Sequence, residues 1–405
     1  MNWHISLHSK EMIWSNIFCC DDVRETQRLR GNIVRTERFF AIITLLALVS
    51  GCGGSSSNNN SSSALSTTDA TSVAAYMDSL AASGNFVGSV LVARGDTVLV
   101  KKGYGWANID KKIVNTPQTK FRIGSNTKQF TAMGILLLEQ QGRLHVADKL
   151  CNFIDACPEA WRAITLKHLL THSSGVPDYT NFDNFPAVIG SQVSVLDLIA
   201  RFKLLPLEMM PGSRWLYSNS GYVLLGYVIE RVSGVAYADF LRANIFMPLQ
   251  MTHSGYDQSK ITADDHARGY LTTTQQPVPL DMSEFYAAGA LYSTVEDMYL
   301  WDKAVTNSVL VSAGAIAPMF TPQIACPTGG CAMVGDTGYG YGWFIADEQS
   351  RRYIYHWGRI DGFISSNGFF PDEQVYVIVL SNLETSNVFQ SAVHAGVLAI
   401  NAANH

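Results

Sequence analysis

Short turn segments separate the β-like runs near the end of this chain, and this spacing constrains the fold more than any other feature. Parallel strands need crossovers of a dozen or more residues, so strands this close must pair antiparallel. The runs are YGYGWFIA (339–346), RYIYHWG (352–358), FISSNGFF (363–370) and VYVIVLSN (375–382), with a predicted helix over 388–400. Two earlier runs, 86–93 and 97–105, meet at Arg94-Gly95-Asp96 and predict a hairpin.

Helical periodicity fills the segment between these two groups of strands. The clearest runs are TKQFTAMGILLLEQQG, LKHLLTH, VSVLDLIARF and SGYVLLGYVIERVSG. The sequence therefore predicts an α+β fold, in which an antiparallel sheet flanked by N- and C-terminal helices is interrupted by an inserted all-helical domain. We expect the domain to span 69–402, with a sheet subdomain over about 69–120 and 286–402 and a helical subdomain over about 121–285.

The charge pattern argues against a nucleic-acid partner. The 405 residues carry a net charge of -5 and no block of Lys and Arg, so the basic footprint of a nucleic-acid-binding protein is missing. A hydrophobic content of 47% is ample for a large core.

An apolar run near the N-terminus predicts export. Residues 39–49 (FFAIITLLALV) are too few to span a bilayer comfortably, follow Arg35 and Arg38, and lead into Ser50-Gly51-Cys52. The ending LVSGC resembles a bacterial lipobox, so we interpret residues 1–52 as a leader and lipoprotein signal peptide. An ordinary signal peptide or a lone membrane anchor is the alternative.

The stretch that follows predicts a flexible link to a membrane. Residues 53–68 are rich in Ser, Asn and Gly and cannot pack, which is typical of a tether. We therefore expect a location in the bacterial cell envelope, with a lipid anchor at Cys52 and the folded domain facing the periplasm or the exterior.

Four cysteines remain in the exported part, namely Cys151, Cys157, Cys326 and Cys331. Four thiols in an oxidising compartment allow three pairings, of which the two local pairs need the least chain rearrangement. The spacings CxxxxxC and CxxxxC are looser than those of zinc knuckles, so disulfides are favoured over a metal. His168 and His172 have a spacing that can bind metal, but no third ligand is apparent, and they are interpreted as structural histidines.

The stretch FRIGSNTKQF (121–130) places Ser125 three residues before Lys128 at the start of a predicted helix. Residues three apart share a helix face, so the hydroxyl and the amine can meet. Burial and the positive end of the helix dipole disfavour the lysine's charge, which would let Lys128 act as the base for a Ser125 nucleophile. The helix start also directs the Ser125 N–H toward an oxyanion. Alone the pattern is weak, because about one Ser-x-x-Lys is expected by chance in such a chain.

A second candidate element is Tyr217-Ser218-Asn219, within PGSRWLYSNSGYVLLG. A phenol beside a lysine can relay the serine proton to a leaving group, and the Asn219 amide can orient both the lysine and a substrate. Tyr179-Thr180-Asn181 fits the same Tyr-x-Asn pattern. We prefer Tyr217, because it precedes a predicted helix that would hold it rigidly.

The third element, His356-Trp357-Gly358, ends a predicted strand and is followed by Arg359. A glycine here would let a substrate backbone approach an edge strand, and the Arg359 N–H could be the second oxyanion donor. Each of the three elements is weak alone, but their occurrence in one order is a stronger signal.

Together these stretches resemble the serine β-lactamase-like superfamily, in the branch that contains class C β-lactamases, D-Ala-D-Ala carboxypeptidases and family VIII esterases. The resemblance covers residues 70–400 and is carried by FRIGSNTKQF, HLLTHSSGVPDY, PGSRWLYSNSGYVLLG, GALYSTVEDM, YGYGW and HWGRIDGF. It implies an active site between an α/β domain and an all-helical domain. It also implies Ser125 as the acylated nucleophile, Lys128 as its base, Tyr217 as an acid/base partner, and Asn219 and His356 as positioning groups.

The third motif departs from the β-lactamases of this branch, which usually carry Lys-Thr-Gly. His356 takes the lysine position, and Trp357 and Arg359 are bulky, which counts against β-lactam hydrolysis. We therefore expect an exported serine hydrolase with an acyl-enzyme on Ser125, an esterase or a carboxypeptidase-like D-amino-acid peptidase. A β-lactamase, or a catalytically silent lipoprotein that binds peptidoglycan or a peptide, is the alternative. No cofactor is expected.

Overall fold

The computed structural model of this chain describes residues 67–258, 264–326 and 335–401. The expected leader and signal peptide, Cys52 and Cys331 all lie outside these ranges, as does most of the expected tether. Helix α1 begins at Thr67, so the last two residues assigned to the tether belong to this helix.

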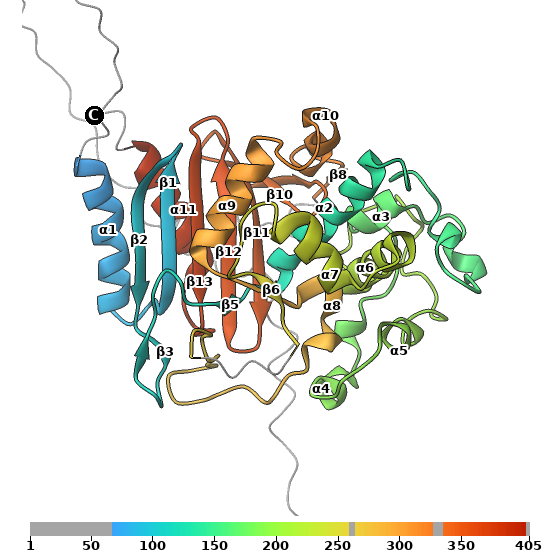
Figure 1. The fold of residues 1–405 in the computed structure, drawn as a ribbon, viewed down its shortest axis with the longest axis horizontal. Coiled ribbons are helices and arrows are strands. Elements are labelled where there is room, and N and C mark those ends of the chain that lie inside the picture. The colour runs from blue at the N-terminus through green and yellow to red at the C-terminus, as the bar shows by residue number, and fades with distance from the viewer. Residues whose placement is uncertain (1–66, 259–263, 327–334, 402–405) are drawn as a thin grey trace, which may run out of the picture. The chain divides into compact units, whose positions relative to one another are not determined.

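An eight-stranded antiparallel sheet draws its strands from both ends of the described chain (Figure 1). In spatial order the strands are β2 (Thr97–Tyr104), β1 (Gly88–Arg94), β13 (Val375–Ser381), β12 (Phe363–Phe370), β11 (Arg351–Ile360), β10 (Phe344–Glu348), β9 (Asp336–Tyr339) and β8 (Ile324–Ala325). The N-terminal hairpin joins the last strand, with Val90 opposite Val379. The expected α+β fold with a shared antiparallel sheet is confirmed.

One predicted strand is divided in two. The run 339–346 forms the end of β9 and the start of β10, separated by a turn in which the Gly340 N–H donates to the Trp343 carbonyl oxygen at 2.8 Å. Gly342 lies in this turn with a φ of +79°, so the chain cannot continue as one extended strand.

Helices cover both faces of the sheet. Helices α1 (Thr67–Ala82) and α11 (Val388–Asn401) contact each other on one face, and α9 (Val295–Thr306) packs against β1 and β13 on the other (Figure 1). Val90 and Val92 belong to the core beneath α11, whereas Leu91 and Ala93 belong to the core beneath α9. Because both faces are buried, these strands are continuously apolar instead of alternating.

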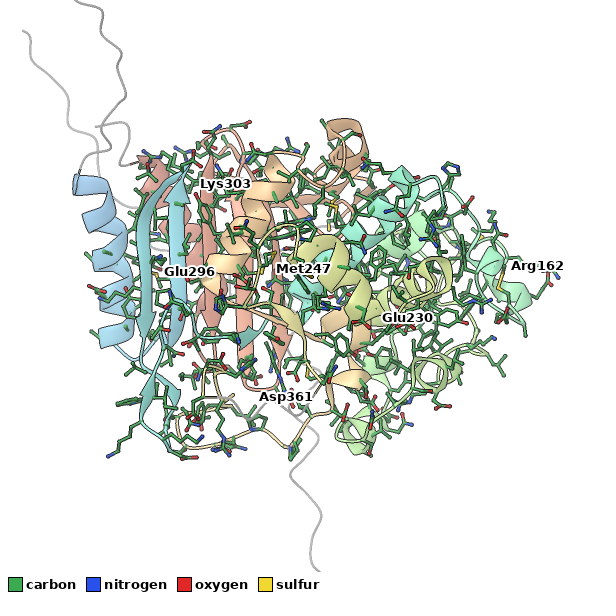
Figure 2. The ribbon with its side chains drawn as sticks, in the orientation of Figure 1. Arg162, Glu230, Met247, Glu296, Lys303 and Asp361 are labelled. Carbon is green, nitrogen blue, oxygen red and sulfur yellow. A yellow bond between two sulfur atoms is a disulfide. The ribbon has the colours of Figure 1, made fainter. Side chains whose placement is uncertain are left out.

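Two ion pairs tie α9 to the N-terminal hairpin. Glu296 and Lys303 are labelled on α9 in Figure 2. Glu296 binds Lys101 of β2 at 2.6 Å, and Lys303 binds Asp96 in the β1–β2 turn at 2.8 Å. Both pairs are partly exposed, so they orient the helix more than they stabilise it.

The chain between the two groups of sheet strands is mainly helical. Its helices are α2 (Thr127–Gln140), α3 (Leu166–Leu170), α4 (Phe185–Val188), α5 (Val195–Ala200), α6 (Asn219–Ser233), α7 (Tyr237–Leu241) and α8 (Tyr286–Gly289). Helix α2 packs on α6 and α8. The short strands β5 (Phe121–Arg122), β7 (Leu291–Ser293) and β6 (Gly255–Tyr256) form a small additional sheet that the sequence patterns did not predict. The remaining short elements are β3 (Trp106–Asn108), β4 (Ile113–Val114) and α10 (Ala313–Ile316).

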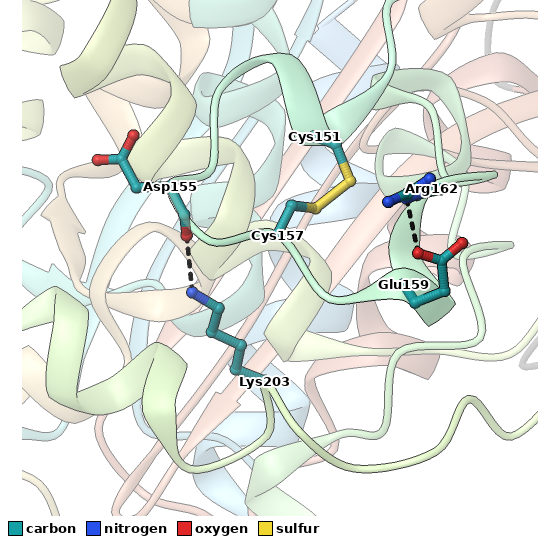
Figure 3. The surroundings of a disulfide bond; sticks show 6 residues. All are labelled: Cys151, Asp155, Cys157, Glu159, Arg162 and Lys203. Atoms are coloured by element: carbon teal, nitrogen blue, oxygen red, sulfur yellow. Dashed lines mark hydrogen bonds and ion pairs between the residues drawn. A yellow bond between two sulfur atoms is a disulfide. The ribbon is translucent and has the colours of Figure 1, made fainter.

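A disulfide joins Cys151 and Cys157 in the loop after α2 (Figure 3). Inside the closed loop the Asp155 carbonyl oxygen accepts a hydrogen bond from Lys203 Nζ at 2.8 Å. Cys326 is also disulfide-bonded, whereas its expected partner Cys331 lies outside the described residues.

None of the helices in the described part of the chain combines the length and apolarity that crossing a bilayer requires.

Candidate active site

Ser125 lies in the 3₁₀ turn η1 (Gly124–Asn126), which directly precedes α2. The sequence had placed it in the first turn of the α-helix itself. Its half-buried hydroxyl is 3.0 Å from Lys128 Nζ and 2.8 Å from the Tyr217 hydroxyl. The structure thus brings together the three residues that were expected to do the chemistry.

Lys128 is fully buried, and three oxygens surround its amine. Nζ is 3.0 Å from Ser125 Oγ, 2.8 Å from Asn219 Oδ1 and 2.9 Å from the Ala288 carbonyl oxygen. Burial lowers the pKa of Lys128 to about 7, while the charge of Asp178 acts in the opposite direction. A neutral amine has two N–H groups and one lone pair. The amide and carbonyl oxygens can only accept, so the N–H groups face them and the lone pair faces Ser125 Oγ.

Tyr217 reaches Ser125 from the loop that leads into α6. Ser218 caps that helix by accepting the Gly221 N–H, and Asn219 is the first helical residue. Burial raises the pKa of Tyr217, so its hydroxyl stays protonated and donates to Ser125 Oγ. The Tyr217 ring also lies 4.8 Å from Lys128 Nζ, which places the amine over an aromatic face.

Tyr179, the competing Tyr-x-Asn residue, points elsewhere. It is buried, and its hydroxyl donates to the Glu284 carbonyl oxygen. Of the two tyrosines, the preferred Tyr217 is therefore the one that contacts Ser125.

Asp178 is a neighbour of the site that the sequence analysis missed. Its Oδ2 accepts the Asn219 Nδ2–H at 3.0 Å, and Thr180 Oγ1 accepts from the same nitrogen at 3.1 Å. The acid was visible in the motif HLLTHSSGVPDY, but its contact with Asn219 spans 41 positions of sequence. Spacing alone could not reveal it.

The two spaced histidines take structural positions apart from each other. His168 caps α3, where its Nδ1 accepts the Thr165 N–H at 3.3 Å. The His172 ring lies 4.2 Å from the Tyr217 ring, and its Nδ1 accepts the Ser218 N–H at 3.1 Å. His172 therefore packs behind Tyr217 and holds the start of α6. Across the described ranges, no group of His, Cys, Asp and Glu is placed to bind a metal ion.

Strand β11 passes directly against the serine turn at Gly358. A Cβ on Gly358 would lie 2.0 Å from the Ile123 carbonyl oxygen and 2.8 Å from Ser125 N. Gly124 has a φ of +51°, and a Cβ there would lie 2.9 Å from Arg359 N. Both glycines allow this close backbone approach, which brings the Arg359 nitrogen next to the serine turn. The role of its N–H as a second oxyanion donor stays a prediction.

His356, expected as a positioning group, has both ring nitrogens hydrogen-bonded within the chain. It is buried on β11, with Nδ1 2.6 Å from the Trp357 carbonyl oxygen and Nε2 3.1 Å from the Tyr339 hydroxyl. The carbonyl must accept, so Nδ1 carries the proton and Nε2 accepts from Tyr339. Burial, helped by the charge of Lys128, lowers the pKa of His356 to about 3. The imidazole is therefore neutral, and both of its nitrogens are engaged within the protein.

The Arg359 side chain is held by an acidic partner. Its Nε donates to Glu384 Oε1 at 2.8 Å, its terminal nitrogen contacts the same oxygen, and Glu384 Oε2 accepts the Gly362 N–H at 3.0 Å. Asp361, labelled in Figure 2, lies in the adjoining turn between β11 and β12. The positive charge of Arg359 is thus compensated within the chain.

Comparison with known proteins identifies similar chains. A family model described as Beta-lactamase matches residues 73–401. The Bacillus subtilis (strain 168) protein PbpX is 32% identical over 304 residues, covering 74% of this chain and 72% of that protein. The octameric penicillin-binding protein homologue from Pyrococcus abyssi is 29% identical with a TM-score of 0.72, covering 82% of this chain and 78% of that one. The D-amino acid amidase from Ochrobactrum anthropi SV3, complexed with D-phenylalanine, is 24% identical with a TM-score of 0.70, covering 84% and 99%.

Proposed function

This chain belongs to the beta-lactamase family, as its motifs led us to expect, and we propose that it is an exported serine hydrolase that forms an acyl-enzyme on Ser125. We assign it to the esterases or to the carboxypeptidase-like D-amino-acid peptidases. The observation that carries the proposal is the position of Ser125 Oγ between Lys128 Nζ at 3.0 Å and the Tyr217 hydroxyl at 2.8 Å.

Acylation begins with Lys128 as the general base. Its neutral amine takes the Ser125 proton, and Oγ attacks the substrate's carbonyl carbon. The negative charge that develops on the carbonyl oxygen is stabilised by the backbone N–H groups of Ser125 and Arg359. Tyr217 is suited to donate and not to abstract a proton here, because burial raises the pKa of its hydroxyl.

The leaving group departs with a proton that comes from Lys128 by way of the Tyr217 hydroxyl. The carbon–oxygen or carbon–nitrogen bond breaks, and the acyl group remains on Ser125. A water molecule then attacks the acyl-enzyme, gives its proton to the same base, and releases the acid. Ser125 recovers its proton, so the cycle closes without a cofactor.

The charges around the site favour substrates that lack a carboxylate beside the scissile bond. Of the two classes proposed, they therefore favour an esterase over a carboxypeptidase-like peptidase, whose substrate carries its terminal carboxylate there. A lysine in the third motif would be a permanent cation, but His356 is neutral near pH 7. Arg359 is already paired with Glu384. A protein of the same fold is named a D-amino acid amidase, so the fold is compatible with D-amino-acid substrates. We therefore rank short esters and D-amino-acid derivatives above β-lactams.

Covalent labelling tests the proposal most directly. A fluorophosphonate, an activated ester or a penicillin should acylate Ser125, and peptide mapping should place the adduct there and nowhere else. Ser125→Ala should abolish labelling without changing the thermal unfolding temperature by more than a few degrees. A folded wild-type protein without an adduct would instead indicate the catalytically silent binding protein.

Side-by-side kinetics separate an esterase or peptidase from a β-lactamase. A p-nitrophenyl acyl ester should give a higher kcat/KM than a chromogenic cephalosporin. Glu384→Ala should reduce the difference in kcat/KM between the ester and the cephalosporin, because the freed Arg359 could bind the carboxylate of the cephalosporin. One ion pair with hydrogen bonds is worth about 1.5 to 3 kcal/mol, or roughly ten- to a hundredfold. Faster cephalosporin hydrolysis by the wild-type protein would favour the β-lactamase.

A further inference from the structure

Asp178 is a buried carboxylate beside the candidate site that the mechanism above does not use. Only 6% of the residue is exposed, and it precedes the 3₁₀ turn η4 (Tyr179–Asn181). Its Oδ1 accepts the Thr180 N–H at 3.1 Å and the Thr180 hydroxyl at 2.9 Å, and its Oδ2 accepts Asn219 Nδ2–H at 3.0 Å. Burial raises the pKa of Asp178, and these three donors oppose that shift because they stabilise the ionised form of the carboxyl group.

The orientation of the Asn219 amide follows from its neighbours. Nδ2 faces two acceptors, Asp178 Oδ2 and Thr180 Oγ1, whereas Oδ1 faces the Lys128 amine at 2.8 Å. A flipped amide would place its oxygen against the carboxylate oxygen of Asp178, which is repulsive. Its N–H groups would face the Lys128 amine and could occupy the lone pair that Ser125 needs, so Asp178 locks the amide in the orientation that leaves this lone pair free.

We propose that Asp178 is a positioning residue for the Ser125 reaction, because it holds the Asn219 amide oxygen against Lys128 and so directs the lone pair of the amine at Ser125 Oγ. This inference rests on the proposed function and adds a residue to it. Asp178 does not touch Ser125 or the reacting atoms. It acts through Asn219 and through its charge.

The charge of Asp178 also raises the pKa of the Lys128 base, against the larger lowering by burial. The titratable side chains that face Lys128 are Asp178 and His172 after α3, Tyr217 and Tyr222 at the start of α6, and His356 on β11. Burial lowers the pKa of both histidines and raises that of both tyrosines, so these four are neutral near pH 7. Among these five side chains, Asp178 is the one whose charge, when it is ionised, raises the pKa of Lys128.

Two substitutions separate the hydrogen bond from the charge. Asp178→Asn keeps an acceptor for Asn219 but removes the charge, so the acid limb of the kcat/KM profile for an uncharged ester should move to lower pH by about one unit. Asp178→Ala also removes the acceptor, and the rate of acylation should fall at least about tenfold, since one orienting hydrogen bond is lost.

Asp297→Asn is the matched control. Asp297 is equally buried, at 3% exposed, and likewise accepts a backbone N–H and a hydroxyl, from His253 and Ser254. Its substitution should alter thermal unfolding but leave the acid limb in place. If Asp178 had a purely structural role, Asp178→Asn would likewise alter thermal unfolding and leave the acid limb in place.

The proposal is overturned if Asp178→Asn shows the wild-type acid limb and folded Asp178→Ala is acylated at the wild-type rate. Failure of the proposed function has a different signature, namely a folded wild-type protein that no acylating reagent labels at Ser125. In that case an NMR titration of the Lys128 side chain decides without turnover. Asp178→Asn should still lower the lysine pKa, and an unchanged titration would overturn the role of Asp178.

Discussion

The buried amine of Lys128 gives the candidate site a defined pH dependence. Its pKa lies at about 7 because burial disfavours the charge, and only the neutral form can accept the Ser125 proton. For an uncharged ester, kcat/KM should therefore fall about tenfold for each pH unit below about 7 and level off above it. His356 does not contribute, because its pKa is lowered to about 3. A pH–rate profile checks this expectation. An acid limb whose apparent pKa lies in the usual range of a carboxylate would contradict Lys128 as the base.

Lys128 and Tyr217 should behave as one unit, since both contact Ser125 Oγ. Either Lys128→Ala or Tyr217→Phe should lower the rate of acylation by orders of magnitude. The double substitution should cost far less than the product of the two, because residues that act together are non-additive. Rates of acylation by an activated ester, measured in single turnover, test this expectation.

Tyr179→Phe is the matched control for Tyr217→Phe. It also removes a buried hydroxyl with a hydrogen bond, but that bond goes to the Glu284 carbonyl oxygen and not to Ser125. The unfolding temperature should fall while the acylation rate stays within a few-fold of the wild type. A larger loss from Tyr179→Phe than from Tyr217→Phe would reverse the choice between the two Tyr-x-Asn segments.

The residues that sequence could predict are those whose spacing or motif implies chemistry. Ser125 and Lys128 follow from helix geometry, and Tyr217 and Asn219 from a second short motif. Asp178 and the Ala288 carbonyl oxygen could not be predicted, because tertiary packing alone brings them to the site. Lys128 and Ala288, for example, are 160 positions apart.

At the scale of elements, the approach of β11 to the η1 turn determines the geometry of the candidate oxyanion site. Buried hydrogen bonds hold this approach: Asn126 Nδ2 donates to Ser365 Oγ at 2.8 Å, and that hydroxyl donates to the Ile123 carbonyl oxygen at 2.8 Å. Strand β12, which carries Ser365, thus links the serine turn to β11. The η1 turn and strand β11 should therefore shift together if either is displaced.

Gly358→Ala should disrupt this junction. The new Cβ would lie 2.0 Å from the Ile123 carbonyl oxygen, and a backbone atom cannot rotate away as a side chain can. Overpacking of this kind typically costs about 1 to 3 kcal/mol of folding free energy. Labelling of Ser125 should fall at least about tenfold, because the oxyanion donors move apart. Thermal unfolding and labelling rates of the variant measure both effects.

Gly314→Ala provides the comparison. Gly314 is exposed in α10, and no atom lies within 4 Å of the position its Cβ would take. Alanine is the better helix former, so stability should stay equal or rise slightly. If both glycine variants lost labelling equally, the close approach at Gly358 would not explain the effect.

Elements were predictable where a long apolar run or helical period defines them. The strands β1, β12 and β13 and the helices α6 and α11 match their runs closely, because burial of whole faces imposes the pattern. The two-residue strands β5 and β6 and the η1 turn are too short to show a period. The division of 339–346 depends on how Gly342 packs against Lys128, whose carbonyl oxygen would lie 2.8 Å from a Cβ there.

At the scale of the whole molecule, export stays a prediction, and the state of the cysteines bears on it. Cys151 is bonded to Cys157, and Cys326 is disulfide-bonded as well. Disulfides persist in oxidising compartments and are rare in the bacterial cytosol, where thiols are kept reduced. An exported domain is consistent with the apolar run at 39–49 and its preceding arginines.

Cys52 should carry lipid when the full chain is made in a bacterial host. It follows the apolar run and Ser50-Gly51, which is the order that resembles a lipobox, and the polar residues 53–66 separate it from α1. The protein should partition into detergent, and mass spectrometry should find the mature N-terminus at a lipid-modified Cys52. Cys52→Ser should lose the lipid yet keep the labelling of Ser125, because the folded domain begins about fifteen residues later. A water-soluble protein cleaved at another residue would show that the run is an ordinary signal peptide, and would leave the proposed chemistry of Ser125 unaffected.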